Sequence, residues 1–152
     1  MATKIKVLFL CTGNSCRSQM AEGWTRKLKS DTFEPYSAGI AARGLDPLAV
    51  KAMAEAGVDI SGQRSKTVDD LDDVPFDYVV TVCGHASESC PAWLRGKAKA
   101  VHVGFDDPPA LAEGAKTTTE ALAHYRRIRD EIRVFVETLP AGLGNRLTRR
   151  TE

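Results

Sequence analysis

A cysteine and an arginine separated by five small or polar residues form the most informative motif in the chain. The segment from Cys11 to Ser18 reads Cys-Thr-Gly-Asn-Ser-Cys-Arg-Ser and directly follows an apolar run. Gly13 and its small neighbours let the backbone curl so that successive N–H groups face inward. Arg17 supplies a planar fork of donors for a tetrahedral oxyanion. The motif therefore predicts an oxyanion cradle around a thiolate nucleophile at Cys11.

The predicted helix after the motif adds the positive end of its dipole, which favours both an oxyanion and a thiolate. The hydroxyl of Ser18 could cap this helix or donate to the Cys11 sulfur. A buried structural cysteine followed by a basic helix residue is the alternative. The expected oxyanion-binding residues are Thr12, Gly13, Asn14, Ser15, Cys16, Arg17 and Ser18.

A carboxylic acid stands in a second polar segment, Asp106-Asp107-Pro108, which follows the fourth predicted strand. A thiolate that displaces an oxygen needs an acid to protonate the departing oxygen. Because Pro108 restricts the backbone beside it, Asp107 is predicted to be this acid. A simple Asp-Pro turn is the alternative.

Cys83 and Cys90 bracket the polar segment Gly-His-Ala-Ser-Glu-Ser. They could form a disulfide only if this flexible segment bends or unwinds to bring the Cα atoms within about 7 Å. A zinc site would recruit His85 or His102, but no second ligand pair has the spacing of a structural site. Two unrelated cysteines remain possible. Cys16 could pair transiently with Cys11 or simply pack.

Length and composition indicate one domain over residues 1–140, followed by a frayed tail over 141–152. The net charge of +1 and the lack of a basic stripe argue against nucleic-acid binding. The sequence shows neither a secretory signal nor an apolar stretch long enough for a membrane helix, so we expect a soluble cytoplasmic protein. In that compartment the cysteines are expected as reactive thiols rather than structural disulfides.

Hydrophobic periodicity alternates between strand and helix. Strands are expected at Ile5–Leu10, Phe33–Ser37, Tyr78–Val82 and Ala100–Val103, with a turn at Ala38-Gly39. Helices are expected at Ser18–Lys29, at Leu48–Ala56 after a start at Asp46-Pro47, at Val68–Val74 and at Thr117–Thr138. Apolar stripes are expected on the first helix (Met20, Ala21, Trp24 and Leu28) and on the last (Leu122, Tyr125, Ile128, Ile132, Phe135 and Leu139). This order predicts an α/β fold with a parallel, doubly wound sheet. The carboxyl ends of such strands carry the active site, which would gather Cys11, Cys83 and Asp106-Asp107.

Several segments together resemble the thioredoxin-coupled arsenate reductases. The first is the segment from Cys11 to Trp24, which contains the cysteine–arginine motif. The others are Tyr36-Ser-Ala-Gly-Ile40, Val80-Thr-Val-Cys83, Cys90-Pro91 and Gly104-Phe-Asp-Asp-Pro108. The resemblance runs from Lys4 to about Leu139. It implies the fold of the low-molecular-weight protein tyrosine phosphatases, a single domain with a four-stranded parallel sheet flanked by helices.

The resemblance also implies a reaction that converts arsenate to arsenite for arsenic detoxification. Cys11 would form a covalent adduct with arsenate held by Arg17 and the loop amides, and Asp107 would protonate the departing oxygen. Cys83 would then attack Cys11, and Cys90 would resolve the product as a Cys83–Cys90 disulfide. Thioredoxin, or another dithiol carrier, would reduce this disulfide. Phosphate would compete as an oxyanion, no metal or organic cofactor is implied, and a monomer is expected.

The runner-up function is a protein tyrosine or phosphomonoester phosphatase, which would use Cys11, Arg17 and Asp107 but resolve the adduct with water. That cycle has no need of Cys83 and Cys90. Phosphatases of this fold usually carry aromatic residues after the Asp-Pro pair, whereas Pro109-Ala110 follow here. Weak phosphatase activity is still expected as a side reaction. A non-catalytic thiol or metal-responsive module is a third possibility, but it leaves the arginine and the acid unexplained.

Several relatives bind a potassium ion near the loop. The matching residues here are Asn14, Glu22 and Ser37, but the position of a further aspartate is occupied by Lys66. An ammonium group there could replace the charge of the ion. We therefore expect activity that does not depend on potassium.

Overall fold

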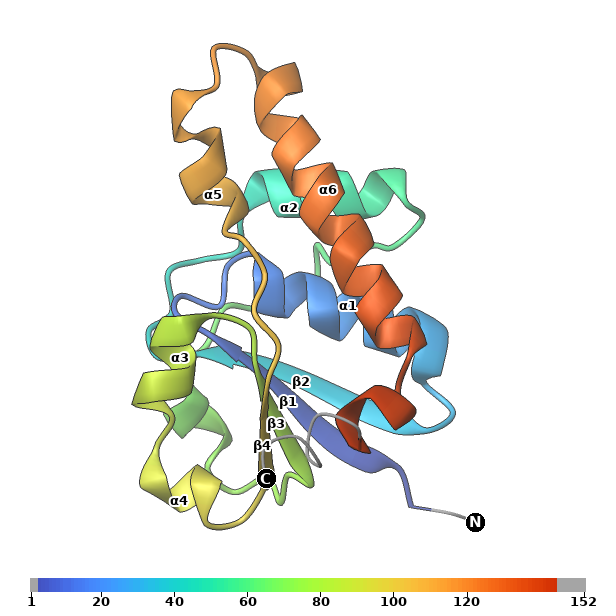
Figure 1. The fold of residues 1–152 in the computed structure, drawn as a ribbon, viewed down its shortest axis with the longest axis vertical. Coiled ribbons are helices and arrows are strands. Elements are labelled where there is room, and N and C mark those ends of the chain that lie inside the picture. Colours follow the sequence, from blue (N-terminus) through green and yellow to red (C-terminus); the bar gives the residue numbers. More distant parts are fainter. Residues whose placement is uncertain (1–2, 145–152) are drawn as a thin grey trace.

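The computed structural model describes residues 3–144. Its centre is a four-stranded parallel sheet in the order β2-β1-β3-β4 (Figure 1). The strands are β1 (Ile5–Cys11), β2 (Phe33–Gly39), β3 (Tyr78–Thr81) and β4 (Lys99–His102). Because β1 is central and covered on both faces, its residues from Val7 to Leu10 are fully buried, as expected for a continuous apolar strand. The predicted α/β class and parallel sheet are confirmed.

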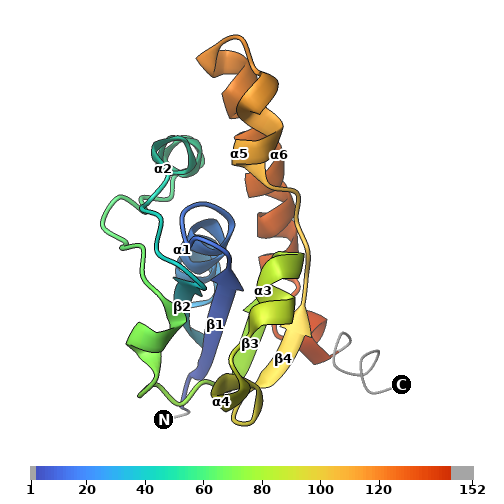
Figure 2. The same cartoon turned by 90° about the vertical axis from the view of Figure 1, so that its left-hand side faces the viewer.

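Helices flank the sheet. They are α1 (Arg17–Lys29), α2 (Pro47–Glu55), α3 (Gly84–Ser89), α4 (Ala92–Arg95), α5 (Pro108–Leu111) and α6 (Thr118–Glu137), with 3-10 turns at Val68–Leu71 and Ala112–Gly114. Helix α1 packs on β1 and β2 and against α6, and α2 also packs on α6 (Figures 1 and 2). The apolar stripe predicted for α6 is buried, because residues spaced by three and four fall on one helix face.

The structure corrects several local predictions. Ala38 and Gly39 do not form a turn, because they pair with Leu10 and Cys11 and extend β2. The segment between Cys83 and Cys90, expected to be flexible, is helix α3. Leu28, placed on the apolar stripe of α1, is 37% exposed because the last turn of that helix extends beyond the core.

The expected tail begins with ordered structure. Residues 141–144 form a helical turn, and Leu143 is buried in the core at 1% exposure. Burial of the apolar Leu143 side chain stabilises this turn against fraying, so packing continues beyond residue 140. The remainder of the expected tail, 145–152, lies outside the described residues.

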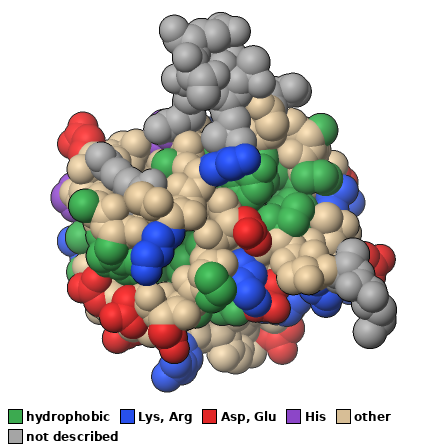
Figure 3. Space-filling model, turned by 90° about the horizontal axis from the view of Figure 1, so that it is seen from below, with side chains coloured by type: hydrophobic (Ala, Val, Ile, Leu, Met, Phe, Trp, Pro, Cys, Tyr) green, Lys and Arg blue, Asp and Glu red, His purple; other side chains and the backbone are tan. Residues whose placement is uncertain are grey.

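Charges of both signs are interspersed on the face shown in Figure 3. This mixture agrees with a net charge close to zero. None of the helices in the described part of the chain combines the length and apolar character needed to cross a membrane.

Candidate active site

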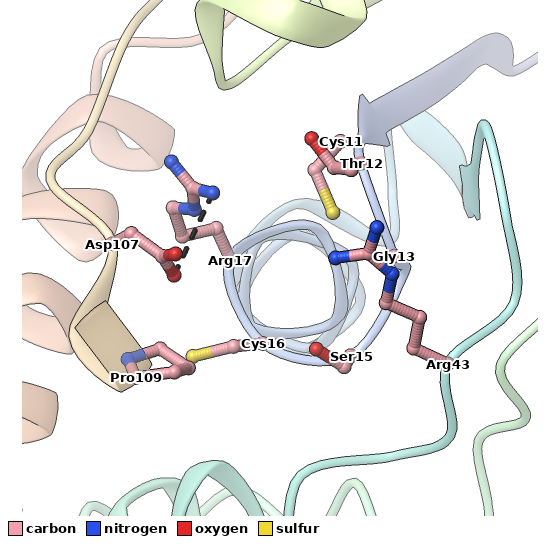
Figure 4. Close-up of a pocket in the computed structure, with 9 residues that line it drawn as sticks. All are labelled: Cys11, Thr12, Gly13, Ser15, Cys16, Arg17, Arg43, Asp107 and Pro109. Carbon is pink, nitrogen blue, oxygen red and sulfur yellow. Dashed lines mark ion pairs between the residues drawn. The ribbon is translucent and has the colours of Figure 1, made fainter. Parts of the chain in front are cut away.

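A pocket of about 290 Å³ opens where β1 ends and α1 begins (Figure 4). Its lining residues are Cys11, Thr12, Gly13, Ser15, Cys16, Arg17, Arg43, Asp107 and Pro109. The pocket thus lies at the carboxyl edge of the parallel sheet, where ligands of such folds bind. It brings together the predicted nucleophile, arginine and acid.

The curl of the loop is held from outside by the segment that follows β2. Four backbone N–H groups of this segment donate to loop carbonyls: Ile40 to Cys11 at 3.1 Å, Ala41 to Thr12 at 2.9 Å, Arg43 to Gly13 at 2.9 Å and Asp46 to Ser15 at 3.0 Å. With these carbonyls turned outward, the N–H groups of residues 13–17 have no acceptor among the described residues. Unpaired amides on the inner side of a curled loop form an anion-binding nest.

Gly39 is required where β2 meets this loop. A Cβ atom there would collide with the Ala41 carbonyl oxygen and lie 2.7 Å from the Asn14 nitrogen. Only a residue without a side chain permits this approach of two backbones. The Ser-Ala-Gly segment therefore positions the cradle rather than ending a strand in a turn.

Asn14 organises the interior of the loop. It has a φ of +48°, the left-handed region that asparagine tolerates better than most residues, and it is fully buried. Its Oδ1 accepts hydrogen bonds from the backbone N–H of Lys66 at 2.9 Å and from Gln19 Nε2 at 3.0 Å. Because a backbone N–H can only donate, this contact identifies the oxygen of the amide. Its Nδ2 then donates to Ser18 Oγ at 2.9 Å.

Ser18 links this network to the nucleophile. Its Oγ lies 2.9 Å from the Cys11 sulfur, and both residues are buried. The hydroxyl accepts from Asn14, so its own proton is free to donate to the sulfur. Of the two roles that the sequence leaves open for Ser18, the geometry favours donation to Cys11, because Ser18 lies inside α1 rather than at its cap.

Arg17 and the predicted acid form an ion pair on one side of the pocket (Figure 4). Arg17 Nη1 donates to the Phe105 carbonyl at 2.9 Å, and Nη2 lies 3.6 Å from Asp107 Oδ1. Asp106 instead pairs with Arg127 of α6 at 3.1 Å. The structure therefore separates the two aspartates, placing Asp107 at the pocket and Asp106 on the surface.

Cys83 lies at the N-cap of α3, close to the loop. Its sulfur accepts from the Ala86 N–H at 3.3 Å and lies 3.2 Å from Thr12 Oγ1. Cys90 is the C-cap residue of the same helix, and both cysteines are buried and not joined in a disulfide. The structure brings Cys83 beside the cradle but leaves Cys90 at the far end of α3.

Cys16 is held as a thiol. Burial raises its pKa well above the ordinary value, and the carboxylates of Asp46 and Asp107 raise it further. It lines the pocket as a neutral group. This environment gives Cys16 less nucleophilic character than an exposed cysteine.

Of the residues expected at a potassium site, Glu22 and Ser37 contact each other, whereas Asn14 bonds to Ser18, Gln19 and Lys66. Ser37 Oγ donates to Glu22 Oε1 at 2.6 Å, and Arg26 Nη2 contacts Glu22 Oε2 at 2.6 Å. Lys66 Nζ donates to the Arg64 carbonyl at 3.0 Å. The direct cationic partner of Glu22 is therefore Arg26, where the sequence suggested Lys66. Among the described residues, no group of three His, Cys, Asp or Glu side chains could hold a metal ion.

Sequence reasoning missed two contributors to this site. Arg43 lines the pocket from the segment after β2. Asp46, predicted only as a helix start, caps α2 through Leu48 N at 2.9 Å and also accepts from Tyr125 of α6 at 2.6 Å. A polar segment directly after a parallel strand was the signal that could have pointed to Arg43.

Fold and pocket define a cysteine-dependent oxyanion site on a parallel α/β sheet. The family model for low molecular weight phosphotyrosine protein phosphatase matches residues 6–149. The arsenate reductase of Halalkalibacterium halodurans is 55% identical over 136 residues, covering 87% of this chain and 95% of that protein. That of Bacillus subtilis is 51% identical over 142 residues, covering 91% and 99%.

A solved structure of an arsenate reductase in the phosphate binding state has a TM-score of 0.74 and 31% identity, covering 90% of this chain and 97% of that one. The chain therefore belongs to the low molecular weight phosphotyrosine protein phosphatase family and, within it, to the arsenate reductases.

Proposed function

We propose that this protein reduces arsenate to arsenite with Cys11, Cys83 and Cys90 as a thiol relay. The observation that supports the relay most directly is the contact of Thr12, the residue after the nucleophile, with the Cys83 sulfur at 3.2 Å. A phosphatase cycle gives no role to a second cysteine at this position. The relatives named arsenate reductase support the same substrate.

In the first step, the Cys11 thiolate attacks arsenate held by Arg17 and the loop amides. A sulfur–arsenic bond forms, an arsenic–oxygen bond breaks, and Asp107 gives its proton to the departing oxygen, which leaves as water. Arsenic remains in its oxidised state in this adduct. The donated hydrogen bond from Ser18 stabilises the thiolate before the attack.

Reduction occurs in the second step. The Cys83 thiolate attacks the Cys11 sulfur, a Cys11–Cys83 disulfide forms, and the electron pair of the sulfur–arsenic bond passes to arsenic. Two thiolates have then been oxidised and arsenic has gained two electrons as arsenite. The cycle needs no resident metal or organic cofactor.

Release of Cys11 requires α3 to unwind. Cys83 and Cys90 cap the two ends of this helix, so at 1.5 Å per residue their Cα atoms lie about 10 Å apart along its axis. A disulfide needs this distance to be below about 7 Å. A helix of 6 residues with one buried side chain, Ala86, has little to hold it. Unwinding lets Cys90 attack Cys83, free Cys11 and present a disulfide to thioredoxin.

The test is arsenate-dependent NADPH oxidation with thioredoxin and thioredoxin reductase. Wild type should turn over repeatedly, Cys83→Ser should release no arsenite, and Cys90→Ser should release one arsenite per chain and stop. Ser89→Ala, a change beside Cys90 in the same helix, serves as the matched control and should turn over like wild type. Sustained turnover by Cys90→Ser would rule out the relay.

Phosphate monoester hydrolysis is proposed as a weak side reaction, because the cradle geometry suits phosphate as well as arsenate. This reaction should survive Cys83→Ser, since water rather than a thiol resolves the adduct. If hydrolysis persisted while arsenate reduction was absent in wild type, the protein would be a phosphatase.

A further inference from the structure

Arg43 is a second arginine at the oxyanion pocket, and neither the loop motif nor the proposed relay includes it. It lies in the segment that seals the outside of the loop, and its backbone N–H donates to the Gly13 carbonyl at 2.9 Å. Figure 4 shows its side chain running back toward Gly13, across the loop from Arg17 and Asp107, and both Arg43 and Cys11 line the pocket. Its position is therefore tied to the cradle by backbone geometry.

The stem of Arg43 occupies space that Gly13 leaves open. A Cβ atom on residue 13 would lie 2.8 Å from Arg43 Cδ and 3.1 Å from its Cγ, closer than such atoms pack. The missing side chain at Gly13 thus lets the arginine lie flat on the loop. Gly13 shapes the pocket in this way in addition to permitting the curl.

Arg43 also carries a charge without a carboxylate partner among the described residues. By contrast, ion pairs with carboxylates are formed by Arg17, Arg26, Arg126, Arg127, Arg129 and Arg133. Within the pocket, Asp107 lies 3.6 Å from Arg17 and offsets part of its charge. Arg43 therefore provides the positive charge of the pocket lining that no carboxylate among the described residues offsets.

The reaction needs such a charge. A phosphate-like oxyanion carries about two negative charges near neutral pH, and it must approach a thiolate. Because Arg17 already faces the carboxylate of Asp107, it offsets little of the repulsion between the oxyanion and the thiolate. Without a second cation, most of that repulsion would have to be offset by the loop amides. A second guanidinium at the rim lowers the cost of placing both anions together and offers a planar pair of donors to an oxygen.

We propose that Arg43 is a second oxyanion-binding arginine that makes the pocket selective for doubly charged tetrahedral oxyanions. The proposal rests on the proposed function, because it concerns the substrate of the same pocket. It assigns Arg43 to binding of the anion before chemistry. Substitution should therefore raise KM for arsenate far more than it lowers kcat.

The experiment measures protection of Cys11 from iodoacetamide by inorganic phosphate at pH 8, which requires no redox turnover. Alkylation is followed by mass spectrometry on the tryptic peptide of residues 7–17. Arg43→Ala should raise the protecting phosphate concentration about tenfold, equivalent to about 1.4 kcal/mol. Arg43→Lys should lie between Arg43→Ala and wild type, because it keeps the charge but loses the fork.

Arg64→Ala is the matched control. Arg64 is exposed, does not line the pocket, and its loss changes the net charge equally. Protection that is the same in Arg43→Ala and wild type, or reduced equally in Arg64→Ala, would overturn the proposal. If phosphate protection depends on Arg43 but no arsenate is reduced, the proposed function fails and this inference stands.

Discussion

The hydroxyl of Ser18 lies 2.9 Å from the sulfur of Cys11 and at the same time accepts a hydrogen bond from Asn14. The single hydroxyl proton of Ser18 is thereby directed at the Cys11 sulfur. Stabilisation of the Cys11 thiolate therefore depends on the side-chain amide of Asn14. Backbone donation from Lys66 sets the orientation of that amide. The segment before the Val68–Leu71 turn thus acts on the nucleophile through a chain of three hydrogen bonds, Lys66 to Asn14, Asn14 to Ser18 and Ser18 to Cys11.

Ser18→Ala should slow alkylation of Cys11 at pH 7 about tenfold, because loss of one charge-assisted hydrogen bond costs the thiolate about 1.4 kcal/mol. The rate is followed with iodoacetamide and mass spectrometry. Ser61→Ala, which removes an exposed hydroxyl bonded to Asp59, is the control and should react like wild type. Equal rates in Ser18→Ala and wild type would show that the hydroxyl does not stabilise the thiolate.

Asp107→Asn should reduce the kcat of arsenate reduction about 100-fold, the lower range for loss of a general acid. Binding of phosphate, measured by protection of Cys11, should not weaken, since the removed charge repels anions. Asp106→Asn is the control, because this carboxylate pairs with Arg127 on the surface, where an ion pair contributes little. Similar losses in both variants would remove Asp107 from the role of acid.

Replacing sodium by potassium at constant ionic strength should leave the reduction rate unchanged. Arg26 contacts Glu22 at 2.6 Å and already balances the carboxylate around which a cation would bind. Steady-state kinetics in the two salts provide the measurement. Strong stimulation by potassium would mean that the ion displaces Arg26 from Glu22.

Tyr125→Phe should lower the free energy of unfolding at pH 7 by about 2 kcal/mol, the range for a hydrogen bond to a charged group. Tyr125 donates to Asp46 at 2.6 Å. Burial, and then this bond, raise the pKa of Tyr125 above its ordinary value. The folded state therefore retains the phenol proton to a higher pH than the unfolded chain does.

The contribution of Tyr125 is complete below the pKa of an unfolded tyrosine, about 10, and declines as the pH rises above it. Urea unfolding of wild type and variant from pH 7 to 11 should show their difference shrinking at the alkaline end. Tyr78→Phe, which removes the hydroxyl of a half-buried tyrosine on β3, is the control and should change stability less. A difference that stays constant to pH 11 would contradict the raised pKa.

Local sequence alone determined the four strands and the three longest helices, and it indicated the candidate chemical groups. Apolar runs and periodic spacing predicted all four strands and the helices α1, α2 and α6, because burial on one face leaves a pattern along the chain. The spacing of Cys11 and Arg17 identified the cradle for a similar reason, since both ends of a loop this short must be neighbours. The neighbouring Pro108 favours Asp107 over Asp106 as the acid, and the structure places Asp107 at the pocket.

Tertiary structure decided what depends on distant segments. Arg43 and Asp46 reach the loop only because the segment after β2 bonds to its carbonyls, and no local pattern encodes that pairing. Gly39 extends a strand rather than a turn because another backbone lies against it. The cationic partner of Glu22 depends on the side chains that fold around it. Sequence patterns report burial and local geometry, whereas contacts between remote segments arise only from the assembled fold.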